Sequence, residues 1–89
     1  MRVRFRVAGI VQGVSYRASA QHEARRLGLS GWVRNHENGD VEGVVEGPDQ
    51  AVRGFLFWCS HGPRGARVTR LDETPDTDDT PLPAFEIHR

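Results

Sequence analysis

The chain opens with an alternation of apolar and basic residues that predicts a β-strand. Val3, Phe5 and Val7 occupy every second position, and arginines occupy the positions around them. A period of two places the apolar side chains on one face of a strand and the arginines on the other. The first strand is therefore expected to have one buried and one solvent-facing side, and to run almost up to Gly9.

Two later stretches have apolar residues at helical spacing. The first predicted helix begins at about Ser15, and its polar residues can face solvent. The second begins after Gly47, because Pro48 is tolerated at the first helical position and Asp49 is favourable beside the helix dipole. Gly62-Pro63 is expected to end it. The apolar positions of the two helices are Tyr16, Ala20, Ala24, Leu27, Val52, Phe55, Leu56 and Cys59.

A β-hairpin is predicted between the two helices. The strands are expected over Ser30–Glu37 and Asp40–Gly47, because Asn38-Gly39 between them is a favoured two-residue hairpin turn. In that register Asn35 lies across from Glu42, near the turn.

The rest of the chain completes the expected architecture. A fourth strand is predicted over Ala66–Asp72 and a short last strand over Phe85–His88, where alternation resumes. Between them, Glu73–Ala84 carries three prolines and four acidic residues and is expected to be a mobile loop. This order of elements predicts a ferredoxin-like α+β sandwich, an antiparallel sheet of four to five strands with two helices on one face.

Length and charge limit the functions that the chain can have. Its 89 residues make one domain, 1–89, with one modest core. Twelve basic and twelve acidic residues give a net charge of zero, which offers no general attraction to nucleic acid or anionic membranes. We therefore expect neither as a partner. All basic residues are arginine, which excludes lysine chemistry such as Schiff-base formation.

Other residues indicate a reduced, metal-free protein. A single cysteine, Cys59, allows no intramolecular disulfide, and we expect it to be a buried core thiol. The protein is expected to be soluble and cytoplasmic. It is also expected to be a monomer. Four histidines lie at no ligand spacing, so solvent-exposed histidines are expected, with no metal site and no cofactor. Trp32 is interpreted as a packing residue, although contact with a ligand stays possible.

The loop from Gly9 to Arg17 carries the candidate chemistry. A loop between a strand and a helix start can direct successive backbone N–H groups toward one anion. Gly9 and Gly13 allow positive φ angles, and Arg17 can grip two oxygens with its planar guanidinium. A phosphoryl group would suit this arrangement, but the lysine and hydroxyl of a nucleotide-binding phosphate loop are missing. A tight turn with an ordinary surface arginine remains the alternative.

Several blocks of the sequence resemble the acylphosphatase family, in order and at its spacing. The resemblance covers nearly the whole chain. The blocks are Gly9–Val14 followed by Arg17, Leu27–Leu29, Gly31–Asn35, Asn38-Gly39, Val41–Gly43, Glu46-Gly47 and Gly62–Val68.

The resemblance implies hydrolysis of a carboxyl–phosphate mixed anhydride without a metal ion. Arg17 matches the arginine that binds the phosphoryl group, and Asn35 matches the asparagine that holds the attacking water. Residues alone identify Asn35 only as an amide near a turn. Inorganic phosphate is expected as product and competitive inhibitor. Ser15-Tyr16 and His36 depart mildly from the family pattern. The implied phosphate-binding loop comprises Gln12, Gly13, Val14, Ser15, Tyr16 and Arg17.

Two functions from other classes are alternatives. A regulatory domain that binds an anion without turnover would keep the loop but would not need Asn35. An RNA-binding domain of the same architecture should carry exposed aromatic residues on its first and third strands. The predicted third strand has no aromatic residue and contains two glutamates between Val41 and Glu46.

Overall fold

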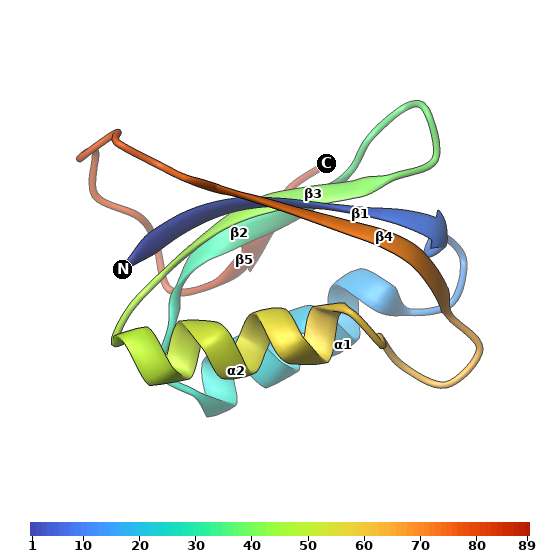
Figure 1. Ribbon diagram of the computed structural model, residues 1–89, viewed down its shortest axis with the longest axis horizontal. Helices are drawn as coiled ribbons and strands as arrows, with labels where there is room; N and C mark the ends of the chain where they lie inside the picture. Colours follow the sequence, from blue (N-terminus) through green and yellow to red (C-terminus); the bar gives the residue numbers. More distant parts are fainter.

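The chain forms a five-stranded sheet with two helices that cover one of its faces (Figure 1). The computed structural model describes all residues, Met1–Arg89. The elements in chain order are β1 (Arg2–Ile10), α1 (Tyr16–Arg26), β2 (Ser30–Asn35), β3 (Val41–Glu46), α2 (Asp49–Cys59), β4 (Arg67–Pro75) and β5 (Glu86–Ile87). The strand order is β4-β1-β3-β2-β5.

This architecture confirms the predicted ferredoxin-like sandwich, with one correction at the edge of the sheet. The first four strands pair antiparallel, but β5 runs parallel to β2. The segment after β4 crosses to the start of β2, where Ala84 bridges to Ser30. The chain then continues along β2 in the same direction. Such a crossing does not impose the antiparallel pairing that a tight hairpin turn would require.

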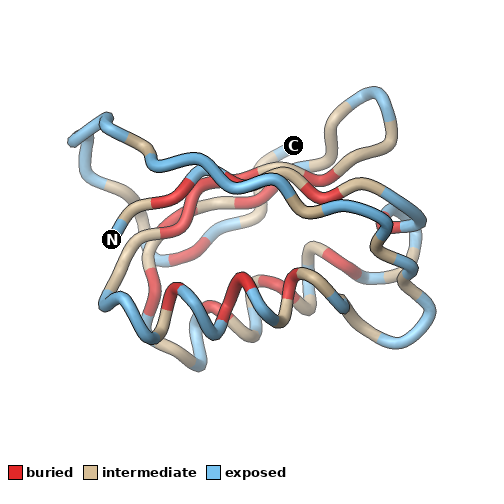
Figure 2. Tube along the Cα trace, in the orientation of Figure 1, coloured by how far each residue is buried: buried red, intermediate tan, exposed pale blue.

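The core lies between the two layers, as the buried positions in Figure 2 show. The alternation in β1 buries Val3, Phe5 and Val7, as predicted. Each such side chain contributes about 1.5–3 kcal/mol through removal from water. Of the predicted helical positions, all are buried except Leu27, which is partly buried. Pro48 is the N-cap of α2 instead of its first helical residue.

Neither helix is long and apolar enough to cross a membrane.

The β2–β3 hairpin has a register one residue away from the prediction. Asn35 lies across from Val41, not from Glu42. The His36 N–H donates to the Asp40 carbonyl at 2.7 Å, so three residues connect these two positions instead of two.

Gly39 explains the longer connection. Its φ of +102° lies in the region that favours glycine, and its N–H donates to the His36 carbonyl to close a turn. The Asn38 side chain accepts a hydrogen bond from the Asp40 N–H. An Asn-Gly pair can therefore form a three-residue loop as well as the two-residue turn.

The fourth strand is longer than predicted. It continues past Asp72 to Pro75, and its last three residues pair with β1, so Glu73–Pro75 does not belong to the expected loop. The segment that follows is attached to β1. The Asp76 N–H donates to the Arg2 carbonyl at 3.0 Å, and the two side chains form an ion pair at 2.9 Å. β4 lies at the edge of the sheet, and edge strands typically carry charged residues. The composition of Glu73–Pro75 therefore resembled that of a loop.

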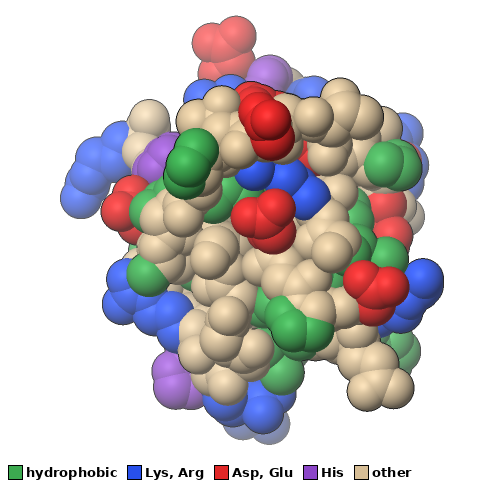
Figure 3. Space-filling view, turned by 90° about the vertical axis from the view of Figure 1, so that its left-hand side faces the viewer, with side chains coloured by type: hydrophobic (Ala, Val, Ile, Leu, Met, Phe, Trp, Pro, Cys, Tyr) green, Lys and Arg blue, Asp and Glu red, His purple; other side chains and the backbone are tan.

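The face of the sheet away from the helices is polar. Arg6 on this face pairs with Asp40 at 2.8 Å. Trp32 stacks on the His88 ring, with 5.1 Å between the ring centroids. Figure 3 views one end of the molecule and shows acidic and basic side chains interspersed, in keeping with the zero net charge. Trp32 is therefore a packing residue on this face, as interpreted from the sequence.

Candidate functional site

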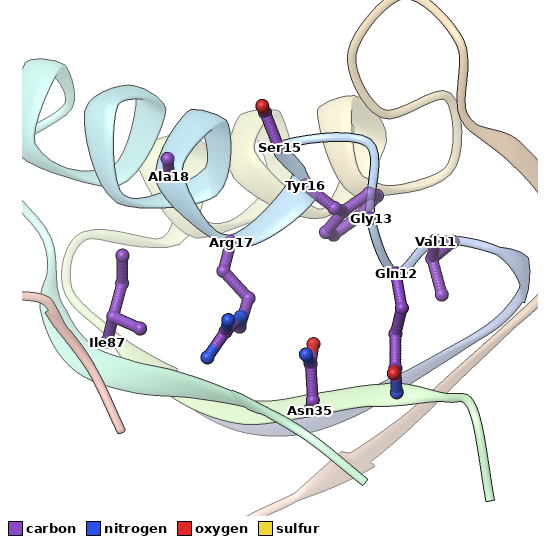
Figure 4. A pocket seen from close by; sticks show the side chains of 9 residues that line it. All are labelled: Val11, Gln12, Gly13, Ser15, Tyr16, Arg17, Ala18, Asn35 and Ile87. Carbon is purple, nitrogen blue, oxygen red and sulfur yellow. The ribbon is translucent and has the colours of Figure 1, made fainter. Parts of the chain in front are cut away.

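The sheet topology brings Arg17 and Asn35 together. Strands β1 and β2 both run antiparallel to β3, so they point in the same direction and end at the same edge of the sheet. The loop that follows β1 therefore lies near the end of β2. Figure 4 shows Arg17 extending from α1 and Asn35 extending from β2 toward the same space.

A pocket of about 200 Å³ occupies this space. The sequence-predicted residues that line it are Gln12, Gly13, Ser15, Tyr16, Arg17 and Asn35. Val14 is not among them, because its side chain packs against the hydrophobic core. The pocket is completed by three apolar residues that sequence analysis did not assign to it, Val11, Ala18 and Ile87. Val11 and Ala18 border predicted site residues, whereas Ile87 has no sequence signal beyond strand alternation.

The loop between β1 and α1 leaves its backbone N–H groups free. Gly13 and Ser15 both have positive φ angles, +75° and +62°. Ser15 caps α1 without a side-chain hydrogen bond. The N–H groups of residues 12–15 donate to no acceptor in the chain, and the first bond of the helix runs from Ser19 N to Ser15 O. A non-glycine residue in this conformation costs about 1–3 kcal/mol and is typical of functional sites.

Arg17 gives the pocket its positive charge. It lies in the first turn of α1, is half-buried and forms no ion pair. Its one hydrogen bond within the chain is long, 3.4 Å from Nη1 to the His88 carbonyl. No acidic side chain lines the pocket. Free N–H groups at a helix start, together with an uncompensated guanidinium, favour an anion there.

Asn35 presents an unpaired acceptor to the same pocket. Gly31 and Val33 precede it on the helix-facing side of β2 and are buried, so strand alternation points Asn35 toward α1. Its Oδ1 is buried and has no hydrogen-bond partner in the chain. An unsatisfied buried acceptor costs about 1–3 kcal/mol, and native proteins contain few of them. Asn35 therefore does not act as the local hydrogen-bonding residue that a position near a turn suggests.

Tyr16 anchors the loop in the core. Its hydroxyl donates to the Cys59 carbonyl at 2.6 Å, and its ring lies 5.4 Å from that of Trp58. Burial raises the pKa of the Tyr16 hydroxyl and of the Cys59 thiol. Both groups stay protonated near neutral pH, so neither is a ready nucleophile. Cys59 is a core thiol, as predicted.

The histidines are dispersed over the molecule. His22 and His61 are exposed as expected, whereas His36 and His88 are partly covered. No group of three or more histidine, cysteine or acidic side chains is placed to hold a metal ion. A metal-independent reaction stays a prediction to be tested by chelation.

Comparisons with known proteins identify a family for this chain. A family model described as acylphosphatase matches residues 3–87. An acylphosphatase from Azoarcus sp. is 57% identical over 67 residues, which cover 75% of this chain and 68% of that protein. One from Anaeromyxobacter dehalogenans is 47% identical over 87 residues, which cover 98% of this chain and 94% of that protein.

Solved structures support the same assignment. The crystal structure of acylphosphatase from Bacillus subtilis matches with a TM-score of 0.94 and 34% identity, covering 99% of this chain and 98% of that chain. The structure of an acylphosphatase from Coxiella burnetii matches with a TM-score of 0.90 and 31% identity, covering 98% of this chain and 90% of that one. The chain therefore belongs to the acylphosphatase family.

Proposed function

We propose that this chain hydrolyses acyl phosphates to a carboxylate and inorganic phosphate, with the phosphoryl group held by the Gly9–Arg17 loop and the water oriented by Asn35. One observation carries the division of roles. The buried, unpaired Oδ1 of Asn35 faces a pocket that also contains Arg17 and borders the free N–H groups. Donors for an anion and an acceptor for water thus lie on opposite sides of one small space.

The phosphoryl oxygens bind on the α1 side of the pocket. Backbone N–H groups from Gln12 to Tyr16 surround them, and the start of α1 adds partial positive charge. The Arg17 guanidinium donates to two of the oxygens. These donors strengthen their contacts as negative charge develops on the phosphoryl group in the transition state.

The attacking water binds on the β2 side. A water hydrogen donates to Asn35 Oδ1, which fixes the water oxygen for attack on phosphorus in line with the leaving carboxylate. The new P–O bond forms as the bond to the acyl oxygen breaks, and the carboxylate leaves with the electron pair. A phosphate oxygen takes the water's proton, so no covalent enzyme intermediate and no general acid are needed.

The two alternative functions explain the site less well. Neither an anion-binding regulatory domain nor an RNA-binding domain uses a buried acceptor opposite the anion-binding loop. Three further expectations belong to this proposal. The protein is a monomer, it is cytoplasmic, and inorganic phosphate competes with substrate.

A phosphate-release assay with a synthetic acyl phosphate tests the proposed function directly. We expect turnover that is competitively inhibited by inorganic phosphate, because the loop binds the phosphoryl group itself. We also expect the rate to be unchanged in EDTA. Phosphate binding without turnover would favour the regulatory domain, and a loss of rate in EDTA that Mg²⁺ or Zn²⁺ restores would overturn the metal-free reaction.

A further inference from the structure

The Gln12 side chain connects the two halves of the site. It extends from the loop after β1 toward the sheet (Figure 4) and contacts the β2–β3 hairpin. Its Nε2 donates to the carbonyls of His36 and Asp40, at 2.9 Å and 3.0 Å. The two hydrogens of one amide group therefore both bond to the hairpin.

These two carbonyls lie at the base of the hairpin, next to Asn35. His36 follows Asn35 directly, and the Asp40 carbonyl also accepts the His36 N–H at 2.7 Å. On its other side the hairpin base is held to β1 by the Arg6–Asp40 ion pair at 2.8 Å. Gln12 thus bonds to the segment whose position determines where the Asn35 side chain lies.

We propose that Gln12 is a positioning residue, whose side chain fixes the distance between the phosphate-binding loop and the Asn35 amide. This inference rests on the proposed function, in which the loop holds the phosphoryl group and the Asn35 amide holds the water. The role of the Gln12 side chain is therefore distinct from that of the Gln12 backbone N–H, which is one of the loop donors for the phosphoryl group.

The effect on catalysis should exceed the effect on stability. The Gln12 side chain is exposed, and a hydrogen bond in such a place contributes about 0.5–1.5 kcal/mol to folding. In contrast, a misplacement of about 1 Å between reacting groups can lower a rate by roughly 100-fold. The side-chain bonds of Gln12 go only to the hairpin carbonyls and involve neither Arg17 nor a loop N–H group, so we expect phosphate binding to be retained.

Gln12→Met tests this role, because methionine has a similar length and shape but cannot donate a hydrogen bond. We expect kcat to fall about 10- to 100-fold, while KM and the inhibition constant of inorganic phosphate stay within about threefold of wild type. Gln50→Met is the matched control. Gln50 is exposed at the start of α2 and forms no side-chain hydrogen bond, so its variant should keep wild-type kinetics.

A double variant shows whether Gln12 acts through Asn35. In an Asn35→Ala background, Gln12→Met should lower kcat by less than about twofold, because the group that it positions is already missing. Thermal melts of each variant give the folded fraction. If Gln12→Met does not fold, Gln12→Asn replaces it, since the shorter amide cannot reach both carbonyls and should give the same kinetic pattern.

Several outcomes would overturn the inference while leaving the proposed function intact. A normal kcat in Gln12→Met would do so, as would fully additive effects in the double variant. Phosphate affinity that falls as much as kcat would make Gln12 a direct ligand instead of a positioning residue. If wild type and Gln50→Met both fail to release phosphate, the proposed function itself is wrong, and this inference fails with it.

Discussion

The two walls of the pocket differ in their chemistry. On the α1 side, the loop N–H groups and Arg17 are all donors, and none of the lining side chains is acidic. On the β2 side, the unpaired group is an acceptor, Asn35 Oδ1. An anion needs hydrogen-bond donors. An attacking water instead needs an acceptor for one of its hydrogens, which directs the lone pair of its oxygen. The asymmetry therefore argues that phosphoryl group and water bind to different walls.

Arg17→Lys tests the need for a planar guanidinium. Lysine keeps the charge but loses the two-pronged geometry and some of the reach, so kcat/KM should fall by at least about 100-fold, on the order of 3 kcal/mol. Arg26→Lys is the control, because Arg26 lies on the same helix and pairs with Glu23 at the exposed surface. Near-normal turnover by Arg17→Lys would remove Arg17 from the mechanism.

Single residues were predictable from the sequence to different degrees. Arg17 was a candidate from the chemistry of a loop before a helix, with an ordinary surface arginine as the open alternative. Asn35 was only a turn amide without the family resemblance, because periodicity does not say which strand ends meet at an edge of the sheet. The Gln12 bonds had no sequence signal, since their acceptors are backbone carbonyls.

At the scale of elements, the loop conformation depends on how β1 ends. The pairing of β1 with β4 shifts register between Ala8 and Gly9, and Gly9 has a φ of +128°. A Cβ at this position would collide with the Arg67 carbonyl. Beyond this irregularity the pairing continues only through Gly9 and Ile10, so the bulge bends β1 just before the chain enters the loop that precedes α1.

A pair of glycine substitutions tests this dependence. Gly9→Ala should lower the free energy of unfolding by about 2 kcal/mol or more, because of the backbone strain and the collision. Gly54→Ala is the control. Gly54 lies inside α2 with no neighbour near its missing Cβ, so alanine should raise stability by about 0.5–1 kcal/mol. Urea titrations measure both, and equal unfolding midpoints would contradict the role given to Gly9.

Periodicity predicted the elements better than their connections. Both helices and the first strand begin and end within about two residues of the expected positions. The hairpin register was wrong because Asn38-Gly39 fits two loop lengths, and the end of β4 was missed because Glu73–Pro75 is charged and contains a proline. The parallel direction of β5 depends on a long crossing, which local patterns do not encode.

At the scale of the whole molecule, ion pairs connect β1 to segments far away in the chain. The hydrogen bond from Arg6 lowers the pKa of Asp40 below its ordinary value of 3.8. A carboxyl whose pKa is depressed by folding stabilises the folded state above its unfolded pKa. That contribution disappears as the pH falls through the lower, folded pKa.

The stability of the protein should therefore fall in acid, in part through Asp40. We expect the free energy of unfolding to decrease between about pH 5 and about pH 2, and to decrease less in Asp40→Asn. Asp79→Asn is the control, because Asp79 is exposed and forms no ion pair. Urea titrations across this range give the slopes. An identical acid dependence in wild type and Asp40→Asn would contradict the assignment.

The most direct test of the proposed site compares Asn35→Ala with Arg17→Ala, by kcat and by the inhibition constant of inorganic phosphate. Asn35→Ala should lower kcat by about 10²–10³-fold, or about 2.7–4 kcal/mol, with phosphate affinity nearly unchanged. Arg17→Ala should lower kcat and weaken phosphate binding together. If Asn35→Ala weakens phosphate binding as much as Arg17→Ala does, or only lowers Tm while kcat per folded molecule is kept, then Asn35 does not orient the water.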